Sequence, residues 1–305
     1  MSLQSTLESP SLASQHVVVR RAPGFASALR STRAALQWRL LLWWAVLLLL
    51  PTAAATLPFW QLLASSLDHS IHAARLAQGL DGLAIADLVT TAAERYGAAI
   101  VNGGLVALAL TVLLSPLLTG MTIAAVRAPR RLGLVALLAA GAQDYGRLLR
   151  MAIWSVVPLG LVTVLGGLAF GAADKVAARA ILESEATHAA RLAMLAAVLL
   201  FVVVHASLEA GRAVLGNDRR RRSAVLAWWS GLKLMLRRPL ALLGSYVAIS
   251  AVGLALAAAL ALARMHLPAL GAPATVAAFL LAQLGVVVLG FMRAARLAAM
   301  MELAR

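Results

Sequence analysis

Three ionisable side chains lie close together near the end of the fourth apolar stretch of the sequence. His205 and Glu209 are four residues apart, and Arg212 follows Glu209 by one helical turn. On a helix, these spacings put the side chains on one face. A histidine and a carboxylate at membrane depth could relay a proton or an ion, because ionisable groups are costly there and usually face a bundle or water. We favour the alternative, an ion pair between Glu209 and Arg212 that fixes where the helix ends.

A second set of possible ligands lies between the first and second apolar stretches. Asp68, His69 and His72 offer one carboxylate and two imidazoles, which are side chains that bind metal ions. A further protein ligand is not obvious, since His188 and His266 are far away in the sequence. We therefore expect an exposed helical surface here and no bound metal.

Uncharged polar side chains also occur inside the apolar stretches, and Asn102 and Gln283 are two of them. Together with His205, Glu209 and Arg212 they make up a candidate intramembrane polar site. They could line a substrate path, although polar side chains in spans more often hydrogen-bond between helices. The sequence has no phosphate-binding glycine loop, zinc-protease motif or serine-nucleophile motif. We therefore expect a protein that is not an enzyme and needs no cofactor.

The composition identifies the environment in which these residues must work. The chain has 305 residues, of which 62% are hydrophobic and 13% are charged, and its mean hydropathy is +0.88. Soluble domains are about 45–50% apolar and about 25% charged. The chain has no cysteine, which excludes disulfides and thiolate chemistry. A soluble fold of this length could not bury so much apolar surface, so we predict an integral membrane protein.

Six apolar stretches are long enough to cross the hydrocarbon core as helices, which takes about 20 residues. These stretches are 40–57, 98–126, 151–173, 192–208, 239–263 and 267–292. They are continuous and not alternating, which favours helices over barrel strands. We predict an all-α, six-helix membrane bundle over residues 23–305, preceded by a disordered cytoplasmic segment over residues 1–22.

The distribution of basic residues predicts the orientation. One side of the predicted bundle carries 21 Arg and Lys residues, and the other carries 6. Cytoplasmic loops hold the excess of basic residues, so both ends are expected in the cytoplasm. The net charge of +15 is then a topology signal and not a sign of nucleic-acid binding. The Ala-, Leu- and Arg-rich composition is typical of a bacterium with a GC-rich genome, so we expect the inner membrane. A cleaved signal peptide is the alternative for the first stretch, but its leading segment would be far longer than usual.

Each outward-going span is preceded by a segment with the pattern of a helix lying in the membrane interface. The three segments are 25–38, 132–150 and 223–238. In the third, Ser223 is the expected N-cap, and Pro239 ends that helix or starts the next. Arg39, Arg150 and Arg238 mark the same point in each unit. The chain therefore has the pattern of three copies of one unit. The first outer loop is expected to form short helices at Phe59–Leu67, Ser70–Gln78 and Leu83–Tyr96.

A basic run and a pair of tryptophans in the third segment are the candidate contacts for lipid headgroups. They are Arg219, Arg220, Arg221, Arg222, Trp228 and Trp229. Each arginine near an anionic leaflet contributes about 1 kcal/mol at best, and tryptophan is enriched at the headgroup level. A plain topology anchor is equally compatible with the basic run, because both roles arise from the same electrostatics.

Several short motifs resemble those of an uncharacterised group of bacterial six-helix membrane proteins with amphipathic cytoplasmic helices before the odd-numbered spans. The motifs are the run 205–213, then Asn217-Asp218-Arg219-Arg220, Trp229-Ser230-Gly231-Leu232, Leu236-Arg237-Arg238-Pro239 and the segment 144–150. The resemblance extends from residue 25 to residue 300. It implies a membrane location and a fold, and it assigns no functional residue, because the group has no established activity.

Two functions are compatible with these features. The first is a non-enzymatic membrane component that binds anionic lipids or a membrane-protein partner, including a second copy of itself, through its interfacial helices and basic loops. The alternative is a small transporter or channel subunit. A polar cavity that water can reach would favour the transporter, whereas a packed apolar bundle would favour the first function.

Overall fold

The computed structural model describes residues 24–67, 86, 89–267 and 271–305, which are almost entirely helical, with no strand among them. Six of the helices in these ranges are long and apolar enough to cross a membrane. They are α2 (Trp38–Leu67), α5 (Gly97–Arg127), α6 (Leu134–Ala177), α7 (Glu183–Asn217), α9 (Pro239–Met265) and α10 (Ala272–Leu303). The shorter elements are α1 (Phe25–Ser31), η1 (Thr32–Ala35), η2 (Ala92–Tyr96) and α8 (Ala224–Arg237). The prediction of an all-α protein with six spans is confirmed.

The helices extend beyond the predicted spans. α2 runs on through Pro51 and Pro58, so the separate helix expected at Phe59–Leu67 is part of α2. Proline is tolerated in membrane helices because neighbouring groups satisfy the backbone carbonyls that it frees. The described end of the expected helix Leu83–Tyr96 is likewise continuous with α5 through the π-helical turn η2. The helix expected at Ser70–Gln78 lies outside the described residues.

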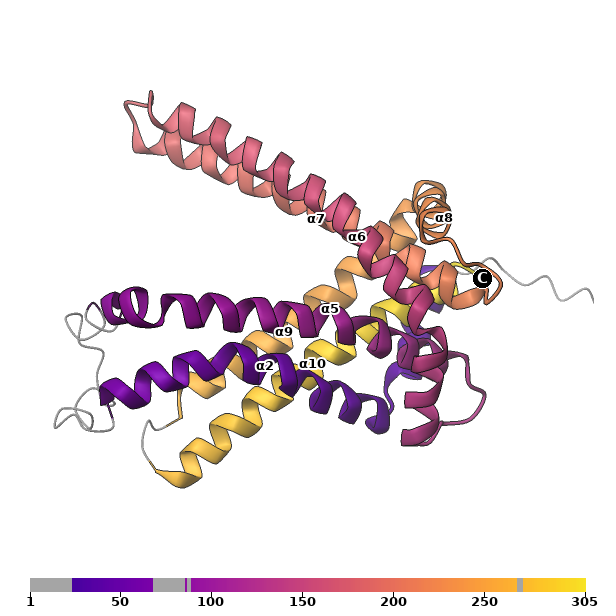
Figure 1. The fold of residues 1–305 in the computed structure, drawn as a ribbon. Helices are drawn as coiled ribbons and strands as arrows, with labels where there is room; N and C mark the ends of the chain where they lie inside the picture. Colours follow the sequence, from indigo (N-terminus) through magenta and orange to yellow (C-terminus); the bar gives the residue numbers. More distant parts are fainter. Residues whose placement is uncertain (1–23, 68–85, 87–88, 268–270) are drawn as a thin grey trace, which may run out of the picture.

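The six long helices form three antiparallel pairs. Figure 1 shows α2 beside α5, α6 beside α7 and α9 beside α10, with the three pairs meeting at one end and spreading apart toward the other. The converging end is formed by α1, α8, the first turns of α6 and the last turns of α5, α7 and α10. The opposite end of the pairs is called the splayed end.

The buried side chains are concentrated at the converging end. They occupy 116–125 in α5, 206–216 in α7 and 290–303 in α10. Large apolar side chains nearer the splayed end remain exposed, for example Leu105, Leu168 and Leu254. The fold therefore has a packed core at one end, and its apolar outer halves must be covered by lipid or by another membrane segment.

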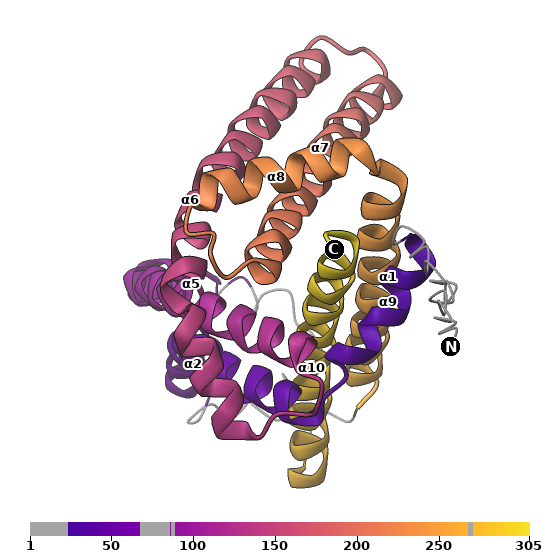
Figure 2. The same cartoon turned by 90° about the vertical axis from the view of Figure 1, so that its right-hand side faces the viewer.

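Short helical segments lie across the converging end, as the sequence predicts. Figure 2 shows α8 crossing α6 and α7, and α1 crossing the ends of α9 and α10. Ser223 is the N-cap of α8, since its Oγ accepts a hydrogen bond from the Leu226 N–H at 3.3 Å. Pro239 starts α9, after a non-helical Arg238. Proline fits the first turn because the N–H there has no partner within the helix.

The second predicted interfacial segment is not a separate helix. α6 runs unbroken for 44 residues from Leu134, so the segment 132–150 is joined to the span that follows it. A proline separates α8 from α9, but Met151 holds the corresponding position in α6 and leaves the helix intact. The early part of α6 still packs on α5 at the converging end (Figure 2).

Two pairs of glycines bring helices together at equivalent places in the first two units. A Cβ on Gly120 of α5 would lie 2.9 Å from the carbonyl oxygen of Gly141 in α6. A Cβ on Gly231 of α8 would lie 2.5 Å from the backbone nitrogen of Gly211 in α7. In both cases the second helix of one pair packs backbone to backbone on the segment that follows it.

Arginine side chains repeat the same relation. Arg39 donates to the Leu132 carbonyl at 3.2 Å, and Arg150 donates to the Arg222 carbonyl at 3.4 Å. Each acceptor lies two residues before the next helix, α6 or α8. In the first two units, the repeated unit that the sequence suggests is therefore also a repeated contact, in which the first helix of the pair is tied to the turn after the second helix of the same pair.

Arg147 closes the end of α7. Its guanidinium donates to the carbonyls of Leu215 at 2.6 Å, Asp218 at 3.1 Å and Arg219 at 2.9 Å, and it pairs with Asp144 at 3.3 Å. The last carbonyls of a helix lack partners within the helix and carry the negative end of its dipole, so a cation is favourable there. Arg147 thereby fixes the turn that leads from α7 into the basic run.

Candidate polar site and basic surface

The ion pair predicted between Glu209 and Arg212 is present and buried. Arg212 donates to Glu209 Oε1 at 2.9 Å, and only 1% of the Glu209 surface is exposed. Both residues lie in the part of α7 that packs into the core. The pair is therefore inside the bundle, and it does not mark the end of α7, which continues to Asn217.

His205 joins a second set of polar contacts that reaches α9 and α10. Its Nδ1 is 2.9 Å from the hydroxyl of Tyr246. Arg296 donates to the same hydroxyl at 3.3 Å and to Ser250 Oγ at 3.1 Å. Its guanidinium carbon also lies 4.9 Å from the centre of the Tyr246 ring, in the range of a cation–π contact. The three helices are thus linked by one chain of hydrogen bonds.

Arg293 brings two further helices into this group. It donates to Ser115 Oγ on α5 at 2.8 Å, and its guanidinium carbon lies 5.7 Å from the ring of Trp44 on α2. The charges of Arg212, Glu209 and Arg296 all act on it. We call His205, Glu209, Arg212, Tyr246, Arg293 and Arg296 the polar cluster. It lies where the three helix pairs meet.

In the sequence, Arg293 and Arg296 follow the last apolar stretch and count among the 21 basic residues of the predicted cytoplasmic side, and Arg212 counts there as well. They lie within helices because α7 and α10 continue past the apolar stretches, and α10 reaches Leu303 without a breaking residue. Tyr246 was missed altogether. One sequence signal for the polar cluster was available. Arg293 and Arg296 are three residues apart directly after a span, which puts both on one helical face.

Asn102 and Gln283 do not join the polar cluster. Asn102 precedes Ser115 in α5 and Gln283 precedes Arg293 in α10, by roughly 20 Å and 15 Å at the rise of an α-helix. Asn102 is exposed and Gln283 is half-buried. The candidate site predicted from the sequence is thus divided. His205, Glu209 and Arg212 lie together, whereas Asn102 and Gln283 lie nearer the splayed end.

The possible metal ligands Asp68, His69 and His72 lie outside the described residues. Within the described part of the chain, no group of three or more histidine, cysteine or acidic residues could hold a metal ion. His188 and His266 are at the splayed ends of α7 and α9. The described residues therefore offer no donor set for a metal centre.

The basic run is at the surface of the converging end. Arg219, Arg220, Arg221 and Arg222 are all exposed in the turn between α7 and α8. Arg221 pairs with Asp218 at 3.3 Å and donates to Ser230 at 2.7 Å. Arg147 donates to the carbonyls of Asp218 and Arg219 in this turn, so the backbone that carries the four guanidinium groups is fixed.

The two adjacent tryptophans of α8 face in different directions. Trp228 donates to Ser207 Oγ at 3.0 Å and packs edge-on against Trp154 of α6, with 5.8 Å between the ring centres. Trp229 is exposed, and Lys233 Nζ lies 5.7 Å from its ring centre. Trp228 therefore anchors α8 to the bundle, and Trp229 is the tryptophan available to lipid.

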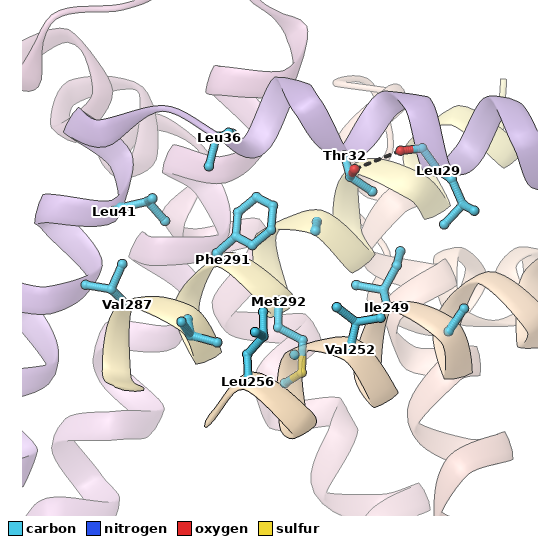
Figure 3. A pocket seen from close by; sticks show the side chains of 14 residues that line it. Leu29, Thr32, Leu36, Leu41, Ile249, Val252, Leu256, Val287, Phe291 and Met292 are labelled. Carbon is cyan, nitrogen blue, oxygen red and sulfur yellow. Dashed lines mark hydrogen bonds between the residues drawn. The ribbon is translucent and has the colours of Figure 1, made fainter. Parts of the chain in front are cut away.

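An apolar pocket of about 410 Å³ opens beneath α1 and η1. Figure 3 shows side chains from α1, η1, α2, α9 and α10 around it, including Leu29, Phe291 and Met292. Its one side-chain hydroxyl, on Thr32, is already bonded to the Leu29 carbonyl at 2.7 Å. The pocket therefore offers hydrocarbon contacts and suits the apolar part of a lipid.

Comparison with protein-family models, curated proteins and solved structures gave no match. The protein is an integral membrane protein by the length and apolar character of its six spans. Beyond that, its function has to be argued from the polar cluster, the basic run and the pocket beneath α1.

Proposed function

We propose that the protein is a non-enzymatic membrane component that binds anionic lipids at its converging end. The observation that carries this proposal is the exposed basic run Arg219–Arg222 next to an amphipathic helix. α8 packs on the bundle with small residues such as Ala227 and Gly231, and its other side exposes Leu226, Trp229 and Leu236. A helix with this division lies in the interface, with its apolar side at the level of the acyl chains.

The arrangement of charge and apolar surface matches a lipid headgroup layer. Guanidinium groups pair with phosphate through forked hydrogen bonds. Lys233 next to the ring of Trp229 puts a cation and an aromatic ring at one level, as is usual at the membrane interface. The apolar pocket beneath α1 adds surface suited to acyl chains at the same end.

We also propose an orientation in the membrane: the converging end and both chain ends lie in the cytoplasm of a bacterium. It is supported by the position of the basic run, α1 and the end of α10 at the same end of the bundle (Figure 2). Reporter fusions after Arg238 and Arg305 should give a cytoplasmic signal, and one near Glu185 an external signal. A periplasmic signal at Arg238 would overturn the orientation and the lipid leaflet assigned here.

Removing the basic run should weaken the preference for anionic lipid. We expect the variant with Arg219→Gln, Arg220→Gln and Arg222→Gln to lose up to about 3 kcal/mol of this preference, since each arginine contributes about 1 kcal/mol. That is on the order of a hundredfold in relative affinity. The preference can be measured in nanodiscs by competition between phosphatidylglycerol and phosphatidylcholine carrying spin labels.

The control for this variant removes the same charge from the splayed end. Lys175, Arg179 and Arg191 lie there and are all exposed, so replacing the three by glutamine tests charge number without changing the basic run. The control should keep the preference for phosphatidylglycerol. Equal losses in both variants would show that only net charge matters, and the proposed surface would then be rejected.

A small transporter or channel subunit is the second candidate function, and the polar cluster is the observation that favours it. Ionisable groups held at membrane depth commonly mark ion or substrate paths. Flux of protons or phosphate through proteoliposomes, lost when Glu209→Gln and His205→Gln are combined in a folded protein, would favour this candidate. If the proteoliposomes pass no protons or phosphate and the protein keeps its preference for anionic lipid, the lipid-binding function is favoured.

A further inference from the structure

The polar cluster holds more positive than negative charge. Among the described residues it contains three guanidinium groups, on Arg212, Arg293 and Arg296, and one carboxylate, on Glu209. Arginine stays charged in proteins, so the excess cannot be removed by loss of a proton from these side chains. A buried charge without a partner is strongly unfavourable. The cluster therefore calls for an anion.

Arg296 supplies a second observation that points to a ligand. Its exposed fraction is 8%, and its Nε is buried without a hydrogen-bond partner among the described residues. Its other known contacts are to the neutral hydroxyls of Tyr246 and Ser250. Buried donors are nearly always satisfied, so an unpaired Nε within an uncompensated positive group indicates a missing acceptor.

The polar cluster is less buried on its side nearer the splayed end. On each of three helices, one polar residue is half-buried, and the polar residue one turn closer to the converging end is buried. The pairs are His205 and Glu209 on α7, Ser250 and Tyr246 on α9, and Arg293 and Arg296 on α10. The half-buried layer therefore lies on the side of the cluster from which the helix pairs diverge in Figure 1, and Arg293 is its cation.

The depth of this layer matches that of a phospholipid phosphate. α10 is uncharged from Ala272 to Met292, which spans roughly 31 Å at the helical rise. The hydrocarbon core is about 30 Å thick, so Arg293 falls at its boundary. A lipid with its phosphate at that boundary directs its acyl chains toward the splayed end, where Leu105, Leu168 and Leu254 are exposed.

We propose that Arg293 and Arg296, with Arg212 beside them, bind the phosphate group of a phospholipid whose acyl chains lie along the exposed apolar halves of the helix pairs. The carboxylate of Glu209 holds Arg212 in place and lowers the excess charge of the cluster to two, of which the phosphodiester of the lipid neutralises one. This internal site is separate from the basic run, and it extends lipid binding from the surface to the centre of the bundle.

The test uses the full chain, purified in detergent and stripped of lipid. Its unfolding temperature is measured with phosphatidylglycerol, with diacylglycerol of the same chains and with inorganic phosphate. We expect a clear rise with phosphatidylglycerol only. An equal rise in unfolding temperature with inorganic phosphate would indicate that the site binds a soluble anion and not a lipid. An equal rise with diacylglycerol would show that the phosphate group is not recognised. Either result overturns the proposal, as does no rise with any of them.

Variants place the effect at the polar cluster. Arg293→Gln should bind phosphatidylglycerol at least tenfold more weakly while the stripped protein keeps or gains unfolding temperature, because the variant relieves repulsion among the arginines. A merely structural role for Arg293 would instead lower the unfolding temperature with and without lipid. Arg293→Lys, which keeps the charge without the fork, should lie between the variant and the native protein. Arg264→Gln at the splayed end is the matched control and should bind normally.

The variant of the basic run separates this site from the proposed function. With Arg219→Gln, Arg220→Gln and Arg222→Gln, the protein should lose its preference for anionic lipid in nanodiscs and still be stabilised by phosphatidylglycerol in detergent. Loss of that stabilisation in this variant, with Arg293→Gln unaffected, would reject the internal site and leave the surface site standing.

Discussion

Glu209→Gln is expected to destabilise the protein by about 3–5 kcal/mol, the range for removing one partner of a buried ion pair. Glu209 is the carboxylate among the three arginines of the polar cluster. Its loss leaves Arg212 without its acceptor at 2.9 Å and increases the uncompensated charge at the centre of the bundle. Chemical unfolding in detergent micelles measures the effect.

The order of the variants is the sharper test. Sequence alone suggests an isolated pair, in which Arg212→Gln does more harm than replacing both residues. With Arg293 and Arg296 close enough to act on Glu209, the carboxylate keeps other cations when Arg212 is lost. We therefore expect Glu209→Gln to be the most harmful, Arg212→Gln the mildest and the double variant intermediate. Additive losses without coupling would contradict the pair itself.

Gly231→Val should destabilise the protein by about 3 kcal/mol or more, the upper range for overpacking a close contact. A Cβ there would lie 2.5 Å from the backbone nitrogen of Gly211, so the two helices must separate. Separation would also move Trp228 from its hydrogen bond with Ser207 and its contact with Trp154. Unfolding in detergent gives the stability, and quenching of tryptophan fluorescence gives the displacement of α8.

Gly146 is the matched control for this substitution. It lies inside α6, is exposed, and a Cβ there would meet nothing within 4 Å. Valine has a somewhat better helix propensity than glycine, so Gly146→Val should change stability by less than about 0.5 kcal/mol. If both variants lost the same stability, the close approach of α7 and α8 would not be what holds α8 in place.

The sequence was sufficient to predict the spans, because each is a long run of apolar residues and few other structures are open to such a run in lipid. The cap of α8 and the start of α9 were also predictable because both effects are local in the sequence: the Ser223 side chain accepts from the Leu226 N–H, and the ring of Pro239 fits the first turn of a helix. The unbroken helix through 132–150 was not. Whether an amphipathic segment continues into a span depends on the residues of the one turn that joins them, and Met151 in that turn does not break the helix.

The polar cluster was predictable only along single helices. The spacing of Glu209 and Arg212 indicates their pairing, because both residues lie on α7. The contacts of His205 with Tyr246 and of Arg293 with Ser115 join helices that are distant in the sequence. Arginines at the end of an apolar stretch have the same pattern whether they anchor the helix in the cytoplasm or enter the core. Only the arrangement of the helices distinguishes the two.

The packing of α1 against α10 has a consequence for synthesis. Ala28 of α1 is fully buried in a cluster with Leu297 and Ala299 of α10. A ribosome adds roughly 5–20 residues per second, so α1 emerges on the order of 10–50 s before the helix that covers it. In that interval its apolar side must rest on the bilayer surface or on an insertion factor. Truncated chains that stop before α10 would keep this apolar surface of α1 uncovered.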